Sequence, residues 1–382
     1  MSFTVLAVIV AAGLLGPLLA LPQRWRIPVV LGELAGGLIL GTTGFGVLDA
    51  TDPSFTLLAD VGFALVMFVA GTHVPIKDPQ LRASLRTGFG RAIVVGIVAA
   101  GLGAVVAAVF ATGHAAMYAV LMASSSAALI LPAIESLGLG GRPVLALLPQ
   151  IALADVACII ALPLAIDPPH ALRAAVGSVL VIGGGLVIYL VLDRFERSGV
   201  RRRVHRISES RRFALELRIN LLILFLLAAL ATRAHVSIML AGFVLGMVIS
   251  AIGEPRRLAR QLFAVTDGLL GPLFFVWLGS SLNIRELGAH PRLILLGVAL
   301  GVGAVAAHVA IRLLGQPVSM GLLASAQLGV PVAAATVGTQ LGVLQPGESA
   351  ALILGALITI GAAILAGQGA VAAGYLRAPE KT

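Results

Sequence analysis

Asp155 is the residue whose type and surroundings point most directly to chemistry. It is the one carboxylate in the otherwise apolar stretch PQIALADVACIIALPL, residues 149–164. A charged side chain in the middle of a bilayer costs roughly 2.5 to 3.5 kcal/mol on insertion scales, so a residue kept there usually binds an ion or a proton. Lost hydration favours the protonated carboxyl group, and the ionised group needs a cation beside it. We therefore predict that Asp155 binds a proton and a monovalent metal cation. The alternative is that Asp155 has a structural role, as a buried acid that accepts hydrogen bonds from hydroxyl groups or forms an ion pair with an arginine.

Three consecutive serines interrupt the apolar stretch of residues 115–137. They are Ser124, Ser125 and Ser126, and Pro132 follows them. Proline removes a backbone donor, and hydroxyl groups satisfy the backbone groups that a broken helix leaves loose. The pattern predicts a discontinuous helix whose hydroxyl and carbonyl oxygens join Asp155 around a cation. Close helix packing is the alternative role of these small residues.

A second interruption lies within residues 317–343. Gln327, Gly329 and Pro331 stand near the centre of this stretch. Broken helices at matching positions of two repeats are the best pointer in a sequence to a transport site. We expect Asp155 to lie at the same depth in the membrane as the midpoints of both interrupted stretches.

The composition fixes the class of protein. Hydrophobic residues make up 59% of the 382 residues, charged residues 11%, and the mean hydropathy is +1.05. Too little polar surface is present to cover a soluble protein of this size, so we predict an integral membrane protein. Apolar runs of about twenty residues indicate transmembrane helices, because a barrel would show alternating segments of about ten residues.

Thirteen apolar runs can be read along the chain, which predicts an all-α polytopic membrane protein. They are residues 3–21, 27–48, 54–74, 91–111, 115–137, 143–166, 171–192, 213–232, 236–252, 267–282, 291–314, 317–343 and 347–374.

Basic residues give these spans a direction. All but five of the 26 lysines and arginines fall on one side if the spans alternate; the exceptions are Arg173, Arg233, Arg285 and Arg292, on the other side, and Arg218, within a span. Loops rich in lysine and arginine stay in the cytoplasm. We therefore predict a cell-membrane protein with an external N-terminus and a cytoplasmic C-terminus, and we attribute the net charge of +9 to orientation rather than to nucleic-acid binding.

The two halves of the chain resemble each other. The pairs are FVAGTHVPI (68–76) with VWLGSSLNI (276–284), LAG (34–36) with LAG (240–242), and LMAS (121–124) with LLAS (322–325). Each pair joins a span with the seventh span after it, and an odd offset inverts the repeat. We predict one transmembrane domain over residues 1–382, with repeat one at about 3–166, a linker helix at 171–192, a basic cytoplasmic loop at 193–212 and repeat two at about 213–374. We expect no soluble regulatory domain.

Several stretches resemble, in order, the monovalent cation:proton antiporter-2 family of the sodium/hydrogen exchanger superfamily. They are VLGELAGGLILG (30–41), LADVGFALVMFVAG (58–71), MASSSAALILPAIESLGL (122–139), ALADVACII (152–160) and PLFFVWLGSSL (272–282). The resemblance implies about thirteen helices, two crossed discontinuous helices, a homodimer, and exchange of Na+ or K+ for H+. It assigns Asp155 to the cation- and proton-binding aspartate and serines 124–126 to the first unwound helix.

The sequence departs from electrogenic members in two ways. They resemble each other in a pair of adjacent acids and in a lysine on the tenth span, whereas here Ala154 precedes Asp155 and the tenth predicted span has no lysine. A single carboxylate that carries both cargoes predicts electroneutral exchange. The resemblance also leaves room for a separate cytoplasmic regulatory subunit.

Two further ionisable residues lie within predicted spans. Glu33 either lines an inner funnel or caps Arg26, and His308 is either a packing residue or a proton-linked one. Enzyme motifs such as H-E-x-x-H, G-x-S-x-G and Walker A are absent from the sequence, so we predict neither an enzyme nor a bound cofactor. The remaining alternatives are a Na+-coupled symporter of a small organic anion on the same architecture and a K+ efflux channel-like protein.

Overall fold

The computed structural model describes residues 2–21, 28–72, 79–198, 214–234, 236–253 and 256–376. Its helices form two compact units, Met1–Ile76 with Leu172–Leu282 (unit 1) and Lys77–Ala171 with Asn283–Thr382 (unit 2). Each unit takes segments from both halves of the sequence. All-α architecture is confirmed over the described residues, where the only β-pairing is a single bridge between Leu139 and Leu376.

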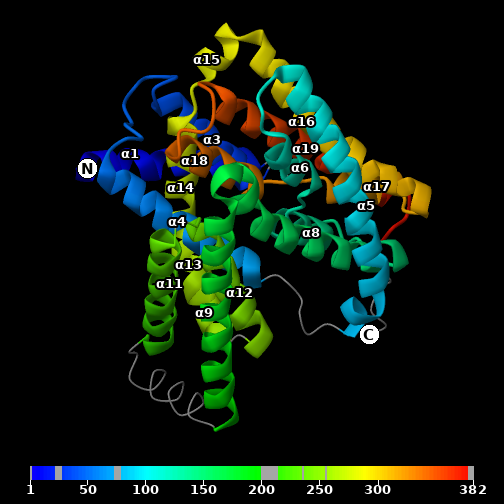
Figure 1. Cartoon of the computed structure of the whole chain (residues 1–382). Coiled ribbons are helices and arrows are strands. Elements are labelled where there is room, and N and C mark those ends of the chain that lie inside the picture. The colour runs from blue at the N-terminus through cyan, green and yellow to red at the C-terminus, as the bar shows by residue number, and fades with distance from the viewer. Residues whose placement is uncertain are drawn as a thin grey trace. The chain divides into compact units, whose positions relative to one another are not determined.

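Unit 1 contains the N-terminal helices and the helices from the middle of the chain (Figure 1). They are α1 (Phe3–Gly13), α2 (Leu15–Ala20), α3 (Val29–Leu40), α4 (Pro53–Thr72), α9 (Ala171–Arg197), α11 (Leu215–Arg233), α12 (Ile238–Ile252), α13 (Arg256–Val265), a π-helical turn (Thr266–Leu270) and α14 (Gly271–Ser281). Local caps define some of these starts. Asp52 accepts the backbone amides of Ser54 and Phe55 at the beginning of α4, at 2.8 and 3.1 Å.

Unit 2 carries both predicted broken spans (Figure 1). Its helices are α5 (Pro79–Phe110), α6 (Ala115–Ala123), α7 (Ala127–Ser136), α8 (Arg142–Ile166), a 3-10 turn (Pro168–His170), α15 (Ile284–Ala289), α16 (Pro291–Val309), a second 3-10 turn (Ala310–Leu314), α17 (Val318–Ala324), α18 (Gly329–Gln340) and α19 (Glu348–Ala372). α5 packs on α6, α8 and α16, and α19 packs on α16, α17 and α18.

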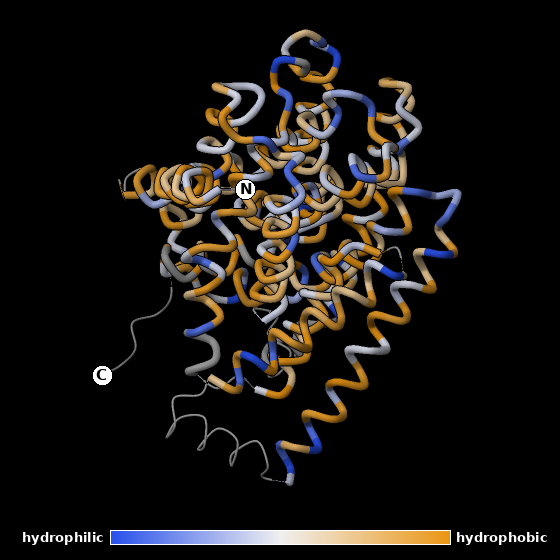
Figure 2. The backbone as a smooth tube through the Cα atoms, turned by 90° about the vertical axis from the view of Figure 1, so that its left-hand side faces the viewer, coloured by the Kyte–Doolittle hydropathy of each residue, from blue (hydrophilic) through white to orange (hydrophobic). Residues whose placement is uncertain are grey.

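The predicted spans correspond to these helices. Ten segments of the described chain are long and apolar enough to cross a membrane. The other three predicted spans are the shorter apolar helices α3 and α12 and the pair α6 and α7. Figure 2 shows hydrophobic colouring along the middle of the long helices and hydrophilic colouring at many helix ends and loops.

Both predicted interruptions are real. Residues 124–126 leave the helical conformation between α6 and α7, and residues 325–328 do so between α17 and α18. Pro132 lies in the interior of α7 rather than at the break, and its side chain is outside the described part. Gly329 and Pro331 lie in the first turn of α18, where a missing backbone donor costs least because those amides have no partner within the helix.

Close helix pairs in unit 1 follow the inverted repeat. A Cβ atom on Gly279 of α14 would collide with the carbonyl oxygen of Leu34 in α3, and one on Gly71 of α4 would collide with that of Phe243 in α12. Gly71 and Gly279 are the glycines that the sequence repeat pairs. The second span thus packs on the tenth, and the third packs on the ninth, as a two-fold relation between the halves requires.

Replacing Gly279 by alanine is expected to lower the melting temperature in detergent by several degrees, because α3 and α14 must separate. Overpacking of this kind costs about 1 to 3 kcal/mol. Gly101→Ala is the matched control, since nothing lies within 4 Å of its added Cβ and the gain in helix propensity is the same. Equal melting temperatures of the two variants would contradict the crossing.

One end of unit 2 joins the termini of four helices. The Arg292 guanidinium at the start of α16 donates to the carbonyl of Val109 near the end of α5, at 3.2 Å. His114, just before α6, lies 2.7 Å from Glu348, the first residue of α19. The charge pattern predicts all of these positions on the external side, so the structure groups them as that topology expects.

The opposite end of unit 2 holds the loop between α7 and α8. The amide of Gly140 donates to the carbonyl of Tyr375, 3.0 Å away, just after α19. α19 has 25 residues, which gives it a length of about 37 Å, enough to cross the apolar part of a bilayer. Thr359 stands near its midpoint and contacts the second break. Both breaks therefore lie near the midpoint of α19.

Candidate ion-binding site

The Asp155 carboxylate lies near the middle of α8 and is 6% exposed. Its Oδ2 atom accepts a hydrogen bond of 3.1 Å from the backbone amide of Ala127. Ala127 is the first residue of α7, so this amide is one of those that a helix leaves unpaired at its N-terminus. The positive end of the α7 dipole therefore faces the carboxylate.

The two broken spans touch through their backbones. The amide of Ser126 donates to the carbonyl of Ala326 at 2.9 Å. Here α6 and α17 end while α7 and α18 begin, so two negative and two positive helix ends meet. The crossing offsets these partial charges without a lysine or arginine among its described contacts.

Side chains reinforce the crossing. Ser125 Oγ donates to the carbonyl of Ala324 at 2.6 Å. Ser124 Oγ lies 2.7 Å from Gln327 Oε1 and 2.8 Å from the carbonyl of Leu121. The hydroxyl hydrogens of both serines thus point at acceptors of the broken spans, and only their oxygen lone pairs remain for a cation.

His308 belongs to this cluster. It lies on α16, is 1% exposed, and its Nε2 atom is 3.3 Å from Ser125 Oγ. Its Nδ1 atom lies 2.9 Å from the carbonyl of Ala304, and because a carbonyl only accepts, Nδ1 carries the hydrogen in that contact. The structure therefore brings His308 to the broken helices beside the predicted serines.

Thr359 of α19 is a contact residue that the sequence analysis did not identify. It is fully buried, and its Oγ1 accepts the backbone amide of Gln327 at 3.3 Å while donating to Ala356. A threonine that bonds the preceding turn of its own helix is common in apolar helices, so only the tertiary contact identifies it.

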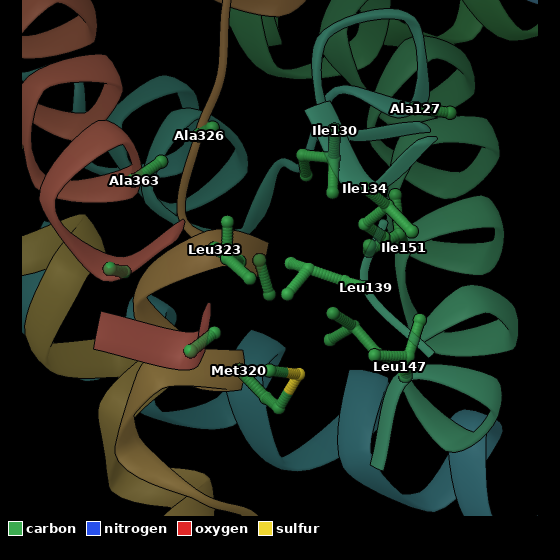
Figure 3. Close-up of a cluster of buried hydrophobic side chains, with 14 residues drawn as sticks. Ala127, Ile130, Ile134, Leu139, Leu147, Ile151, Met320, Leu323, Ala326 and Ala363 are labelled. Carbon is green, nitrogen blue, oxygen red and sulfur yellow. The ribbon is translucent and has the colours of Figure 1, made fainter. Parts of the chain in front are cut away.

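An apolar cluster adjoins the crossing (Figure 3). Its side chains come from α7 and α8 on one side and from α17 and α19 on the other, and Leu139 and Leu323 point toward each other within it. Ala127 and Ala326, which take part in the backbone bonds of the site, belong to this cluster. Dry surroundings strengthen those bonds and raise the cost of a bare carboxylate.

Glu33 is the predicted site residue that belongs to the other unit. It lies on α3 in unit 1, is 4% exposed, and packs against the backbone position of Gly16. Its suggested partner, Arg26, is outside the described residues. Within the described part of the chain, no group of three or more His, Cys, Asp or Glu side chains converges as a metal site would require.

A family model described as "Sodium/hydrogen exchanger, transmembrane" matches residues 8–367. The chain belongs to this family. Membership fits a site built from one buried carboxylate and two broken helices, and the family is one of transmembrane transporters.

Two curated relatives match along most of the chain. The putative Na+/H+ antiporter YjbQ of Bacillus subtilis is 24% identical over 377 residues, which are 94% of this chain and 61% of the relative. The glutathione-regulated potassium-efflux system protein KefC of Salmonella paratyphi B is 26% identical over 304 residues, 77% of this chain and 48% of the relative. The chain thus spans about half to three fifths of the length of these relatives.

A solved structure shares the fold of this chain. The sodium proton antiporter MjNhaP1 from Methanocaldococcus jannaschii superposes with a TM-score of 0.66, covering 97% of both chains at 17% identity. The predicted antiporter-like fold is therefore confirmed.

Proposed function

We propose that the protein is a secondary active transporter that exchanges Na+ or K+ for H+ by alternating access. The observation that carries this proposal is the Asp155 carboxylate, buried at mid-helix against the N-terminus of α7 where two broken spans cross. The names of YjbQ and KefC, an antiporter and a potassium-efflux protein, support exchange over symport.

The mechanism follows from competition for one carboxylate. A proton neutralises Asp155 covalently, and a cation neutralises it as an ion pair, with further oxygen ligands from the broken helices. Either occupied state is close to neutral and can cross between inward-facing and outward-facing forms, whereas a bare buried charge is penalised. One cargo must therefore leave before the other enters, which couples their movements.

The residues of the crossing take different roles in this proposal. Ser126, next to the Ala127 amide, and the lone pairs of Ser124 and Ser125 offer oxygen ligands. Gln327 positions Ser124, and His308 lies beside Ser125. Gly329 and Pro331 favour the start of α18 after the second break, whereas Pro132 lies inside α7 and does not interrupt the first span. Glu33 is a candidate for the inner funnel.

The partners and the membrane placement complete the proposal. We infer a homodimer in the cell membrane, with the N-terminus outside and the C-terminus in the cytoplasm. A molar mass of one chain by light scattering in detergent would refute the dimer, and protease cleavage of the C-terminal tail only from the external side would refute the orientation. By analogy with the name of KefC, a cytoplasmic regulatory partner is a further candidate.

The function is tested by purified protein in liposomes that carry a pH-sensitive dye. Adding Na+, K+ or Li+ outside is expected to drive protons out through the protein, and at least one cation should act with saturating kinetics. Liposomes without protein are the control. Failure of every monovalent cation to move protons, with protein that remains monodisperse, would refute exchange.

Electroneutral coupling is expected because one carboxylate carries both cargoes. Clamping the membrane potential with valinomycin at different K+ gradients should change the rate of Na+-driven proton efflux by less than about twofold, since an uncompensated charge would feel about 2.3 kcal/mol per 100 mV. An efflux rate that changes tenfold or more with the membrane potential would show that unequal charges are exchanged.

A further inference from the structure

Three polar side chains meet at the end of unit 2 where α6 and α19 begin. Glu348 Oε1 accepts the Tyr118 hydroxyl at 2.7 Å and lies 2.7 Å from His114 Nδ1. Its Oε2 accepts the backbone amide of Gln345 at 2.9 Å. Glu348 and Tyr118 are fully buried, and the His114 side chain is 16% exposed.

The cluster holds the first broken span at its beginning. His114 is the residue before α6, and its carbonyl accepts the amide of Tyr118 at 2.9 Å. α6 has nine residues and ends at the serines of the crossing. A helix this short has little stability of its own, so tertiary contacts decide where it lies.

The same carboxylate belongs to the helix that supports the second break. Glu348 begins α19, and Thr359 of α19 accepts the amide of Gln327. α19 thus contacts the start of the first broken span and the middle of the second. A change in the contact of Glu348 with Tyr118 would reach the crossing at Ser124, which lies less than two helical turns further along α6.

His114 and Glu348 are the base and the acid that a pH-dependent contact needs. The hydrogen bond to Glu348 raises the pKa of His114 above its usual value near 6.5, against the opposing effect of burial. Below that usual value His114 is charged and the ion pair is complete. As the pH rises through the raised pKa, the imidazole loses its charge, and the electrostatic part of the contact is lost.

No further charge compensates Glu348 among its described contacts. α6 and the segment between α18 and α19 contribute no other acid or base besides Tyr118. On the neighbouring elements, Arg292 is exposed and donates to Val109, and Arg285 and His290 are exposed. The His114 proton is therefore the charge that balances the buried carboxylate.

We propose that His114, Tyr118 and Glu348 form a pH-sensitive clamp on α6, which slows exchange when His114 is protonated and releases it at alkaline pH on that face of the membrane. This inference rests on the proposed exchange function for its consequence, but the clamp itself is a property of the fold. The charge pattern assigns the face to the exterior.

The first test measures the clamp without transport. Melting temperatures in detergent are compared between pH 6 and pH 9 for the wild type, His114→Gln, Glu348→Gln and the double variant. The wild type is expected to lose several degrees relative to the single variants as the pH rises, and the double variant should match either single one. A wild-type profile that parallels His114→Gln at every pH would overturn the clamp.

The second test measures exchange in liposomes as external pH varies. The pair is expected to change the rate by up to about tenfold, because the interaction that is lost is a charge-assisted hydrogen bond. His114→Gln and Glu348→Gln should be fast already at pH 6. His170→Gln is the matched control, because His170 Nδ1 lies 2.8 Å from Asp167 in an exposed pair of the same unit. Wild-type pH dependence in His114→Gln would overturn the proposal. Absent exchange in the wild type would refute the transport function, while the melting series would still decide the clamp.

Discussion

Replacing Asp155 by asparagine is expected to abolish cation-driven proton exchange and to leave the protein folded. Asparagine keeps an oxygen that can accept the amide of Ala127, so the start of α7 retains its partner. It cannot bind a proton at neutral pH or neutralise a cation, so neither cargo has a site. Proton efflux from liposomes should fall to the rate of protein-free vesicles for Na+, K+ and Li+ alike.

Binding gives the same variant a second measurement. A cation at about 100 times its dissociation constant stabilises the folded protein by about 2.7 kcal/mol, so the transported cation should raise the melting temperature of the wild type but not that of Asp155→Asn. Asp167→Asn is the control, since Asp167 follows α8 and pairs with the exposed His170. Exchange that survives in Asp155→Asn would remove the central assignment.

Replacing Ser125 by alanine is expected to reduce both stability and exchange. The change leaves the buried carbonyl of Ala324, at the end of α17, without the hydroxyl that donates to it at 2.6 Å. An unsatisfied buried acceptor costs about 1 to 3 kcal/mol, which lowers the melting temperature by several degrees. The exchange rate should fall by about tenfold, because the two broken spans lose a link beside the carboxylate.

Ser178 provides the comparison for that variant. It is also buried in an apolar helix, but its hydroxyl has no partner among the described residues. Ser178→Ala should therefore keep the wild-type melting temperature or raise it slightly. If Ser125→Ala and Ser178→Ala behave alike, Ser125 contributes packing alone.

The order of helices and the two breaks could be predicted because they depend on local composition. Apolar runs of bilayer length mark spans, and the serines before Ala127 and the polar residues near Gly329 mark where helices end. Gly329 and Pro331 do not define the bounds of the second break, because glycine and proline are tolerated in the first turn of α18 as well as in a loop. Asp155 could be singled out from the sequence, because the energetic cost of a carboxylate in an apolar run does not depend on which residues contact it.

The grouping of helices and the clamp could not be predicted in the same way. Hydropathy shows that α3 and α14 are apolar but does not say that Gly279 lies against Leu34, and the sequence halves suggested repeats rather than the two units. Glu348 is an ordinary acid in the first turn of a helix when seen in sequence. Its contact with His114 joins residues 234 positions apart. Their shared place on the predicted external side was the only available signal.

Asp155 is also the N-terminal cap of a helix that lies elsewhere in the chain. α7 begins with the amide of Ala127, and its acceptor comes from α8 rather than from a neighbouring residue. A cation that draws Oδ2 toward itself must weaken that bond, and a departing cation restores it. The Ala127 amide is therefore a built-in reporter of occupancy, whose hydrogen-exchange rate or nitrogen chemical shift would follow the cargo through the transport cycle.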